Sequence, residues 1–485
     1  MLTAWRRQAR GAIIAPLVRR PPRKMNYPES IDYLLSFADF ERSGRFQDRP
    51  DVEPVLALLR RLGDPHLGRD TVHIAGSKGK GSVAAMVESV LRAAGHTTGL
   101  FTSPHLHSYT ERIRVNGKPL AEDDWARLTG VLRAAVEVEA PAAEGRQLVT
   151  FDLLTALAFL AFREGAVRCQ VLEVGLGGRV DSTNVFHTSG TRLGESRPTE
   201  AGPTGEVAHV CAITAIGLEH TDVLGDTVEE IAGEKAGIIA PGAGVVIGPQ
   251  PHAAARKVIR RAAEEAGCPI VDVSARYSWR LDSSDLDGQT FDLKGPGGAQ
   301  RLRIPLLGEH QIENAATAVA CVDALRERGL EVPGAAVKRG LAEVHWPGRM
   351  EILSRRPVVV ADGAHNRDSA RRLRESLTRY LSCRGAFLIV GMSAGKDAIG
   401  LAEELAPVAS GVIAVRADHP RAMPPQEAAA AFRRAGVDAK VGQGVAAALD
   451  GALAAAAGEG VICLTGSLFV VAEGRAHLRG IAATV

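Results

Sequence analysis

Apolar and polar positions follow two alternating periods along most of the chain. Short apolar runs typical of buried strands are followed by longer stretches with apolar residues three and four apart, the spacing of helices. The strand-like runs of the first part are 71–75, 169–174, 209–216 and 244–248, and the clearest helical stretches are 151–162 and 253–267. This alternation predicts an α/β fold on mostly parallel sheets, with helices on both faces.

The pattern changes twice further along. Between about 275 and 305, short alternating runs such as "YSWRL" and "QRLRIPL" predict a small antiparallel sheet. After "HWPGRME" (345–351) a second α/β series begins, with the strand-like runs "PVVVADGAH", "AFLIVGM", "GVIAVRA" and "GVICLTGS". We therefore predict a linker near 343–348, an N-terminal domain over 26–345 and a smaller, Rossmann-like C-terminal domain over 346–485.

Length and composition fit this division. A chain of 485 residues is long enough for two or three domains, because single cores stop growing near roughly 250–300 residues. Hydrophobic residues make up 46% and charged residues 24%, as in ordinary globular proteins. No apolar run reaches about 18 residues, which argues against a transmembrane helix. The six cysteines include no C-x-x-C pair, so we expect reduced core thiols in a cytoplasmic protein.

The net charge of +2 comes from the first 25 residues, which hold seven arginines and lysines and no acid. The rest has 51 basic against 56 acidic residues, a balance of −5 that gives no electrostatic case for nucleic acid. The leader is similar to a transit peptide, but "MNYPES" at Met25 would also open a protein if the start were assigned too early. We place 1–25 outside the fold on either interpretation, and expect 187–206, rich in Gly, Pro, Ser and Thr, to be a surface loop.

The glycine-rich segment "HIAGSKGKGS" (73–82) separates a strand-like run from an apparent helix. A glycine turn in that place directs backbone N–H groups and the positive end of the helix at one point, which suits phosphate. Lys80 would add a charge at the terminal phosphates and Ser82 a hydroxyl group. The match to G-x-x-x-x-G-K-[ST] is imperfect, because Ile74 replaces the first glycine and Gly81 separates Lys80 from Ser82. An ordinary glycine turn is the alternative.

Two later segments bring polar groups to strand ends. In "LEVGLGGRVDSTNV" (172–185), Glu173 ends a buried strand and Asp181 follows after a glycine turn. A carboxylate at the carboxyl end of a parallel strand faces the ligand crevice, where it can bind Mg²⁺; a solvated loop acid is the alternative. In "IGLEHTDVLGDTVEEIAGEKAGII" (216–239), His220 follows a strand and Lys235 lies in a helix. A lone histidine or lysine is more often structural.

The motifs, taken in their order along the chain, resemble those of the folylpolyglutamate synthase/dihydrofolate synthase family of the Mur-ligase superfamily over about 26–475. The segments that carry the resemblance are "NYPESIDYLLSF" (26–37), "HIAGSKGKGS", "FTSPHLHSYTERIRVNG" (101–117), "EVGLGGRVDSTN", "HTDVLGDTVEEIAGEKAGII", "LLGEHQIENA" (306–315), "WPGRME", "DGAHN" (362–366) and "TGSLF" (465–469).

The resemblance implies an ATP-dependent ligase that joins L-glutamate to a folate. Its ATP-binding domain (26–345) and its glutamate-ligase domain (346–485) would close over the nucleotide. The folate carboxylate would attack the γ-phosphate, giving an acyl phosphate and ADP, and the amine of glutamate would then displace phosphate. Asn314 would contact adenine, with helix packing as the alternative, Arg349 would reach the γ-phosphate and Asp362 the ribose. The implied ATP-binding residues are Gly76, Ser77, Lys78, Gly79, Lys80, Gly81, Ser82, Asn314, Arg349 and Asp362.

The resemblance also implies two Mg²⁺ ions. Ser103, Glu173 and His220 would hold magnesium, and Lys235 would serve a second ion as a carbamate, because an unmodified ammonium beside Mg²⁺ would be repelled. The implied catalytic residues are Lys80, Asp181, Lys235 and His365.

Four residues would contact the substrates. Asp181 would lie near the folate carboxylate and the amine, and His365 near a phosphate or the incoming glutamate. Phe151 would face the pterin and Ser467 the glutamate. A core aromatic and a helix N-cap are the respective alternatives for Phe151 and Ser467.

Several features depart from the family pattern and leave substrate preference open: Lys78 replaces the usual asparagine, Ser77 a threonine, Arg367 a proline, and Asp152 a glutamate. Rival functions are a Mur-type ligase acting on a cell-wall precursor, whose loop usually ends "GKTT" or "GKST", and a nucleotide-binding switch without ligase chemistry. Whether dihydropteroate is also a substrate is undecided by these motifs. We expect a cytoplasmic monomer that binds neither nucleic acid nor membrane.

Overall fold

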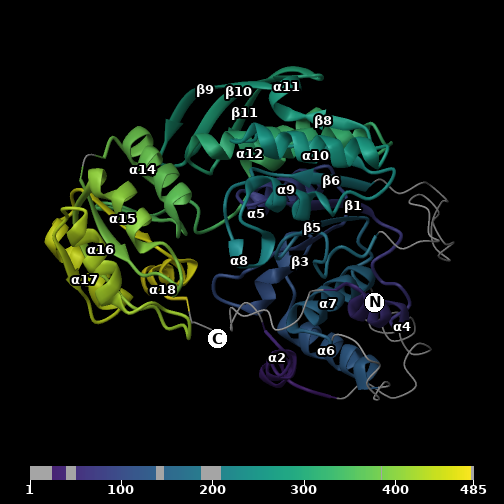
Figure 1. Ribbon diagram of the computed structural model, residues 1–485, viewed down its shortest axis with the longest axis horizontal. Coiled ribbons are helices and arrows are strands. Elements are labelled where there is room, and N and C mark those ends of the chain that lie inside the picture. The colour runs from purple at the N-terminus through teal and green to yellow at the C-terminus, as the bar shows by residue number, and fades with distance from the viewer. Residues whose placement is uncertain (1–23, 40–50, 138–146, 187–208, 384, 482–485) are drawn as a thin grey trace, which may run out of the picture. The chain divides into compact units, whose positions relative to one another are not determined.

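The computed structural model describes residues 24–39, 51–137, 147–186, 209–383 and 385–481 (Figure 1). The predicted loop 187–206 and all but the last two residues of the basic leader lie outside these ranges. The chain divides into two compact units, which we describe separately. Unit 1 comprises 1–104, 109–277 and 314–340, and unit 2 comprises 105–108, 278–313 and 341–485.

Unit 1 is built on an eight-stranded sheet in the order β4-β3-β2-β5-β1-β6-β7-β8. From β2 to β8 neighbouring strands are parallel, whereas β3 and β4 add an antiparallel edge. The strands are β1 Asp70–Ala75, β2 Thr98–Phe101, β3 Ile113–Val115, β4 Lys118–Pro119, β5 Cys169–Glu173, β6 His209–Ile213, β7 Gly244–Ile247 and β8 Ile270–Asp272.

Both faces of this sheet are covered. All residues of β1, β5 and β6 are buried, although successive side chains on a strand point to opposite faces. Near-continuous apolar runs are the mark of such doubly covered parallel strands, which is why the sequence pattern located them. The predicted α/β class with a mostly parallel sheet is confirmed.

In unit 1, α2 and α4 precede the first strand, and the other helices lie between or after the strands along the chain (Figure 1). Helix α7 is apolar nearly all round and is buried from Asp152 to Phe162, as expected of a helix within a core. The helices of unit 1 are α2 Tyr27–Leu35, α4 Glu53–Arg61, α5 Lys80–Ala93, the 3₁₀ turn η1 Tyr109–Arg112, α6 Glu122–Glu137, α7 Thr150–Glu164, α8 Thr221–Leu224, α9 Val228–Ala236, α10 Ala253–Glu265 and α11 Val273–Arg276. Two more helices are divided between the units: α12 Glu309–Arg326 begins in unit 2 and continues into unit 1, and α13 Gly334–Ala342 begins in unit 1 and ends in unit 2.

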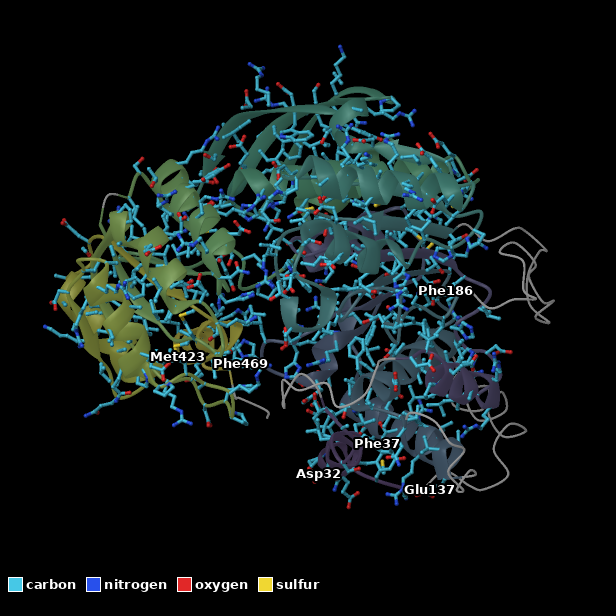
Figure 2. All side chains as sticks on the ribbon, in the orientation of Figure 1. Asp32, Phe37, Glu137, Phe186, Met423 and Phe469 are labelled. Carbon is cyan, nitrogen blue, oxygen red and sulfur yellow. The ribbon has the colours of Figure 1, made fainter. Side chains whose placement is uncertain are left out.

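An aromatic cluster closes the core beside α7. Phe186, labelled in Figure 2, packs against the rings of His66, His73 and His209. His66 is 4% exposed and also faces Phe159 of α7. Burial lowers the pKa of His66 to about 3, with Arg69 and Arg60 adding to the effect, so the folded chain holds this ring neutral.

Unit 2 contains two further sheets. The predicted antiparallel sheet is present as β9 Ser278–Asp285, β10 Gly288–Gly295 and β11 Gly298–Ile304 in the order β11-β10-β9. The second α/β series forms a six-stranded sheet in the order β12-β13-β17-β14-β15-β16, antiparallel only at β12. Its strands are β12 Glu351–Arg355, β13 Val358–Ala361, β14 Ala386–Val390, β15 Ala409–Ala414, β16 Ala439–Val441 and β17 Val461–Thr465.

The helices of unit 2 alternate with these strands, which confirms the predicted second α/β fold. They are α14 Arg367–Leu381, α15 Ala398–Leu405, the 3₁₀ turn η2 Ala406–Val408, α16 Pro425–Arg434, α17 Val445–Ala456 and α18 Leu468–Arg479. All six cysteines are buried and none forms a disulfide, as the sequence predicted. Across the described ranges, no helix combines the length and the apolar character needed to cross a bilayer.

Candidate active site

The glycine-rich loop lies where β1 ends and α5 begins. Gly76 has φ +148° and Gly79 has φ +89°, conformations that residues with a Cβ rarely adopt. Gly79 is the N-cap of α5 and has no side chain to accept hydrogen bonds from the first turn. Lys80, Gly81 and Ser82 form that turn, so their N–H groups are placed to bind an anion together with the helix dipole.

Hydrogen bonds to the segment after β6 hold this loop in place. The N–H groups of Ser77 and Lys78 both donate to the carbonyl of Ala215, at 2.9 and 3.0 Å. The Ser77 hydroxyl donates to the carbonyl of Gly217 at 3.0 Å. The loop is therefore fixed to residues about 140 positions later in the chain, a contact that no local pattern could predict.

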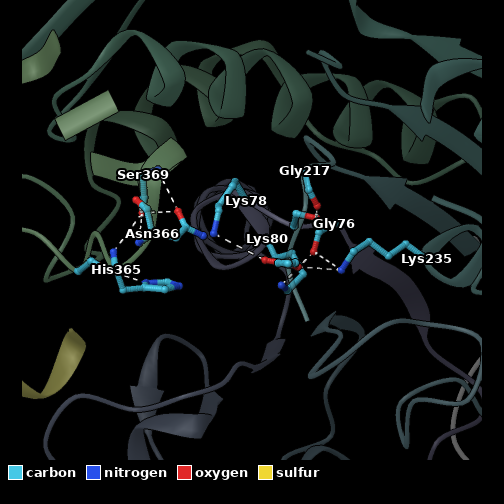
Figure 3. Close-up of polar contacts among 11 residues, drawn as sticks. Gly76, Lys78, Lys80, Gly217, Lys235, His365, Asn366 and Ser369 are labelled. Carbon is cyan, nitrogen blue, oxygen red and sulfur yellow. Dashed lines mark hydrogen bonds and ion pairs between the residues drawn. The ribbon is translucent and has the colours of Figure 1, made fainter. Parts of the chain in front are cut away.

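Two lysines meet at the loop's first carbonyl. Lys80 Nζ donates to Gly76 O at 3.0 Å, and Lys235 Nζ, from α9, donates to the same oxygen at 3.0 Å (Figure 3). Lys235 also donates to Glu219 Oε1 at 3.0 Å, and Lys78 Nζ lies 3.6 Å from Glu219 Oε2. The structure thus brings Lys78, Lys80 and Lys235 together, and it adds Glu219, which the sequence interpretation missed.

Lys235 and Glu219 change each other's pKa. The Lys235 side chain is 2% exposed, and burial lowers its pKa to about 8 although Glu219 opposes the change. Burial would raise the pKa of Glu219, but Lys235, Lys80 and Lys78 outweigh it and hold that pKa well below its usual range. Glu219 is therefore an anion among three cations.

The predicted magnesium ligands Ser103 and Glu173 are adjacent. Glu173 is buried at the end of β5, and its Oε2 accepts the Ser103 N–H at 3.2 Å. His220 follows Glu219 at the N-cap of α8, with φ +50°. Among the described residues, no group of three or more His, Cys, Asp and Glu could hold a metal ion. The pair still fits Mg²⁺, which keeps several waters and uses one or two carboxylates with substrate phosphates.

Asp181 is buried, and the hydrogen bonds that it accepts hold the conformation of the loop after β5. Its Oδ2 accepts the N–H groups of Gly175 and Leu176, at 3.1 and 2.9 Å. Its Oδ1 accepts the N–H and hydroxyl of Thr183, at 3.0 and 2.5 Å. Burial raises the pKa of Asp181, and these hydrogen bonds work against that rise. Both carboxylate oxygens are thus engaged within the loop.

Asp152 supports the same loop from α7. It accepts the hydroxyl of Ser182 at 2.5 Å and the N–H of Val149 at 2.9 Å. Phe151, beside it, is half-buried, lies 5.6 Å from the ring centre of Phe101 and leaves no room for a side chain at Gly175. The core alternative for Phe151 therefore describes at least part of its environment.

Asn314, on α12, faces the phosphate loop. A Cβ at Gly79 would lie 3.1 Å from Asn314 Cγ and would overlap its Oδ1. The close approach of this amide requires glycine at position 79. It also places Asn314 beside the end of α5 where an anion would bind.

In unit 2 the predicted residues follow β13 and β17, two neighbouring parallel strands. Asp362 Oδ2 accepts the N–H of Met350 at 2.9 Å, and its Oδ1 accepts that of Ala364 at 3.0 Å. Arg349 Nη1 donates to the carbonyl of Gly348 at 3.1 Å, and its charge lowers the pKa of Asp362, although burial has the larger, opposite effect and leaves that pKa raised.

The other two predicted residues of unit 2 lie just before helices: His365 precedes Asn366, the N-cap of α14, and Ser467 is itself an N-cap. His365 Nδ1 lies 2.9 Å from the carbonyl of Gly363, and its N–H donates to Ser369 Oγ at 3.0 Å (Figure 3). Ser467 is the N-cap of α18, with its hydroxyl accepting the N–H of Val470 at 3.3 Å. The N-cap alternative for Ser467 is therefore present in the structure.

Comparisons with known proteins show the family of this chain. Residues 193–322 match the Mur ligase middle domain, and 348–468 match the Mur ligase glutamate ligase domain. A Bacillus subtilis dihydrofolate synthase/folylpolyglutamate synthase is 33% identical over 382 residues, which cover 78% of this chain and 84% of the relative. The chain belongs to the folylpolyglutamate synthase/dihydrofolate synthase family of Mur-type ligases.

Two further comparisons extend the likeness. A Haloferax volcanii protein named as a probable bifunctional folylpolyglutamate synthase/dihydropteroate synthase is 36% identical over 468 residues, or 93% of this chain; the chain spans about half, 50%, of that relative. A Mycobacterium tuberculosis folylpolyglutamate synthase, solved with ADP and AMPPCP, is 31% identical with a TM-score of 0.80, and the match covers 95% of this chain and 100% of that one. The family fold therefore extends over both units.

Proposed function

We propose that this member of the folylpolyglutamate synthase/dihydrofolate synthase family is an ATP-dependent ligase that adds L-glutamate to a folate and releases ADP and phosphate. The loop at 76–82 supports the proposal, because it leads into the N-terminus of α5, where no side chain caps the first turn, and because Lys80 lies in that turn. The relatives' names favour folate over a cell-wall precursor as the acceptor.

The proposed reaction has two displacements. A carboxylate oxygen of the folate attacks the γ-phosphorus while the bond to the β-phosphate oxygen breaks, giving an acyl phosphate and ADP. The amine of glutamate then attacks the acyl carbon, phosphate leaves with its bridging oxygen, and the amine proton passes to solvent or a nearby base. Lys80, whose ammonium donates to Gly76 O, would turn to the transferring phosphoryl group and offset its charge.

Magnesium would be held near Ser103 and Glu173, with His220 and Lys235 as further ligands in the two-ion arrangement. When bound, it would supply neutralisation of the phosphate charge. Lys235 suits carbamylation because burial lowers the pKa of its amine to about 8, so the neutral amine that reacts with carbon dioxide is more accessible than in an exposed lysine. A carbamate would keep one N–H, which could stay on the Gly76 carbonyl, and its negative charge near Glu219 would favour a bound cation.

The remaining assignments extend this scheme. Asn314 and Asp362 would contact the nucleoside, and Arg349 the γ-phosphate. We further propose that His365, with its ring held by the Gly363 carbonyl, acts at a phosphate or at the incoming glutamate.

Asp181 would help to bind the folate by holding its own loop in shape through the hydrogen bonds that it accepts. Phe151 would contact the pterin, and Ser467 the glutamate. The domain boundary at 345, the monomeric state and the cytoplasmic location stay predictions; the six buried thiols fit a reducing compartment.

One assay tests the proposed function. The purified full chain is incubated with ATP, Mg²⁺, L-glutamate and either dihydropteroate or tetrahydrofolate, and ADP release is followed together with the mass of the pterin product. We expect ADP formation that needs both glutamate and a pterin acid, with a product heavier by one glutamyl residue. ADP formation unaffected by omission of either substrate would contradict the proposal.

A further inference from the structure

Glu219 joins two elements that carry the site. It lies between β6 and α8, and its side chain is 11% exposed. One carboxylate oxygen, Oε1, accepts a hydrogen bond from Lys235 of α9 at 3.0 Å. The other, Oε2, lies 3.6 Å from the ammonium of Lys78 in the phosphate loop. The carboxylate thus bridges the loop and the helix that carries the buried lysine.

Lys78 is held to the same segment twice. Its N–H donates to the carbonyl of Ala215 at 3.0 Å, and its side chain pairs with Glu219 four residues further on. Lys78 adds a second lysine to the loop beside Lys80. Glu219 supplies the matching negative charge.

While Lys235 is an unmodified ammonium, before nucleotide and metal bind, the three lysine side chains would repel one another without an anion between them. Lys80 and Lys235 share the carbonyl of Gly76 (Figure 3), and the Lys78 ammonium lies 3.6 Å from Glu219 Oε2. A bound nucleotide brings its own negative charge on the phosphates, but before it arrives the described residues offer Glu219 as the anion that contacts both Lys78 and Lys235.

We propose that Glu219 is a positioning residue for nucleotide binding: by bridging Lys78 and Lys235 it holds the phosphate loop in its receptive form before ATP and metal bind. This inference rests on the proposed ATP-binding role of the loop, but on neither the folate nor the glutamate half of the reaction. The inference predicts the direction in which nucleotide affinity changes when the Glu219 carboxylate is removed. If that carboxylate only repelled the phosphates, its removal would tighten nucleotide binding, whereas the loss of a positioning residue weakens binding.

The test is ADP binding by titration calorimetry without folate or glutamate, on the wild-type chain and on Glu219→Gln. The matched control is Glu234→Gln, which removes the same charge from α9 beside Lys235 but whose partner is Arg179. We expect Glu219→Gln to weaken ADP binding about fivefold or more, and Glu234→Gln to change it less than twofold. Equal or tighter binding by Glu219→Gln would overturn the inference. Failure of the wild type to bind ADP would instead contradict the proposed function.

A second measurement does not depend on the folding of Glu219→Gln. Lys78→Met removes the other end of the bridge from a side chain that is 24% exposed, so the fold should tolerate it. In the nucleotide-free chain, hydrogen exchange at the amides of 76–82 should be faster in Lys78→Met than in the wild type, since one fastening of the loop is lost. Unchanged exchange would show that the bridge does not order the loop. Urea unfolding of each variant confirms that the comparisons are made on folded protein.

Discussion

The clearest structural prediction concerns Gly79, the N-cap of α5. Its φ of +89° and its contact with Asn314 both require a residue without a Cβ. Gly79→Ala should therefore damage the phosphate loop in two separable ways. Gly95 supplies the matched control, because its φ is +93° and nothing lies within 4 Å of the Cβ that alanine would add.

The backbone cost should be the same at both positions. A left-handed conformation costs an L-residue about 1–2 kcal/mol, so each alanine should lower the free energy of unfolding by about that amount. Only at Gly79 does the new Cβ overlap Asn314 Oδ1, which forces that amide or the loop to move by roughly 1 Å. A misplacement of that size at a positioning group can cost about 100-fold in rate, or about 2.7 kcal/mol of barrier.

Two assays separate these effects. Urea unfolding measures the free energy of unfolding, and kcat/KM for ATP measures how well the loop binds and positions the nucleotide. We expect similar losses of stability in the two variants, with kcat/KM near wild type in Gly95→Ala and about 100-fold lower in Gly79→Ala. If the two variants agreed in kcat/KM within threefold, the inferred link between the Gly79 backbone, Asn314 and nucleotide binding would be wrong.

Two further predictions follow from buried groups. Lys235→Ala should lower turnover by about 100-fold or more while the circular dichroism spectrum stays unchanged, because the substitution removes both a donor to the Gly76 carbonyl and the proposed carbamate. Near-normal turnover at modest Mg²⁺ would refute this prediction, and mass spectrometry of the active enzyme shows whether the carbamate exists. The pKa of His66 is about 3 when folded against 6.5 in the unfolded chain, so its contribution to stability is complete above pH 6.5 and is lost as the pH falls, by about 2 kcal/mol at pH 5. His66→Phe should reduce the fall in urea midpoint between pH 7 and pH 5, and an unchanged fall would show that other groups cause it.

The layers of this fold could be predicted because burial leaves a periodic trace. Strands such as β1 and β5 are buried on both faces and so appear as continuous apolar runs, and α7 appears as a long apolar helix. Edge strands lack that trace: β4 is two exposed residues and β16 is mostly exposed, and neither was recognised. Their position depends on pairing with a neighbour rather than on their own composition.

The site could be predicted in part for a similar reason. The glycine loop and Glu173 show in the sequence because glycine spacing and a strand-end carboxylate are local signals. Glu219 does not, since its importance comes from Lys78 and Lys235, which reach it from other elements. The excess of lysines in and near the loop was the available hint, because a buried cluster of cations requires an anion.

Asp181 shows the opposite limit of the sequence. Its motif predicts a catalytic or substrate-binding acid, whereas the structure shows four hydrogen bonds that it accepts within its own loop. The sequence cannot distinguish an acid that faces a ligand from one that folds the loop around it. That distinction depends on which backbone N–H groups the loop turns inward.

Isotope transfer tests the central claim most directly. A folate substrate with ¹⁸O at both oxygens of the reacting carboxylate is converted with ATP, Mg²⁺ and L-glutamate, and the phosphate released is analysed by mass. Because the proposed acyl phosphate keeps the attacking carboxylate oxygen on phosphorus when the amine displaces it, we predict one ¹⁸O in each phosphate formed, together with ADP. Unlabelled phosphate, or AMP and pyrophosphate formed in step with the product, would contradict ligation through an acyl phosphate.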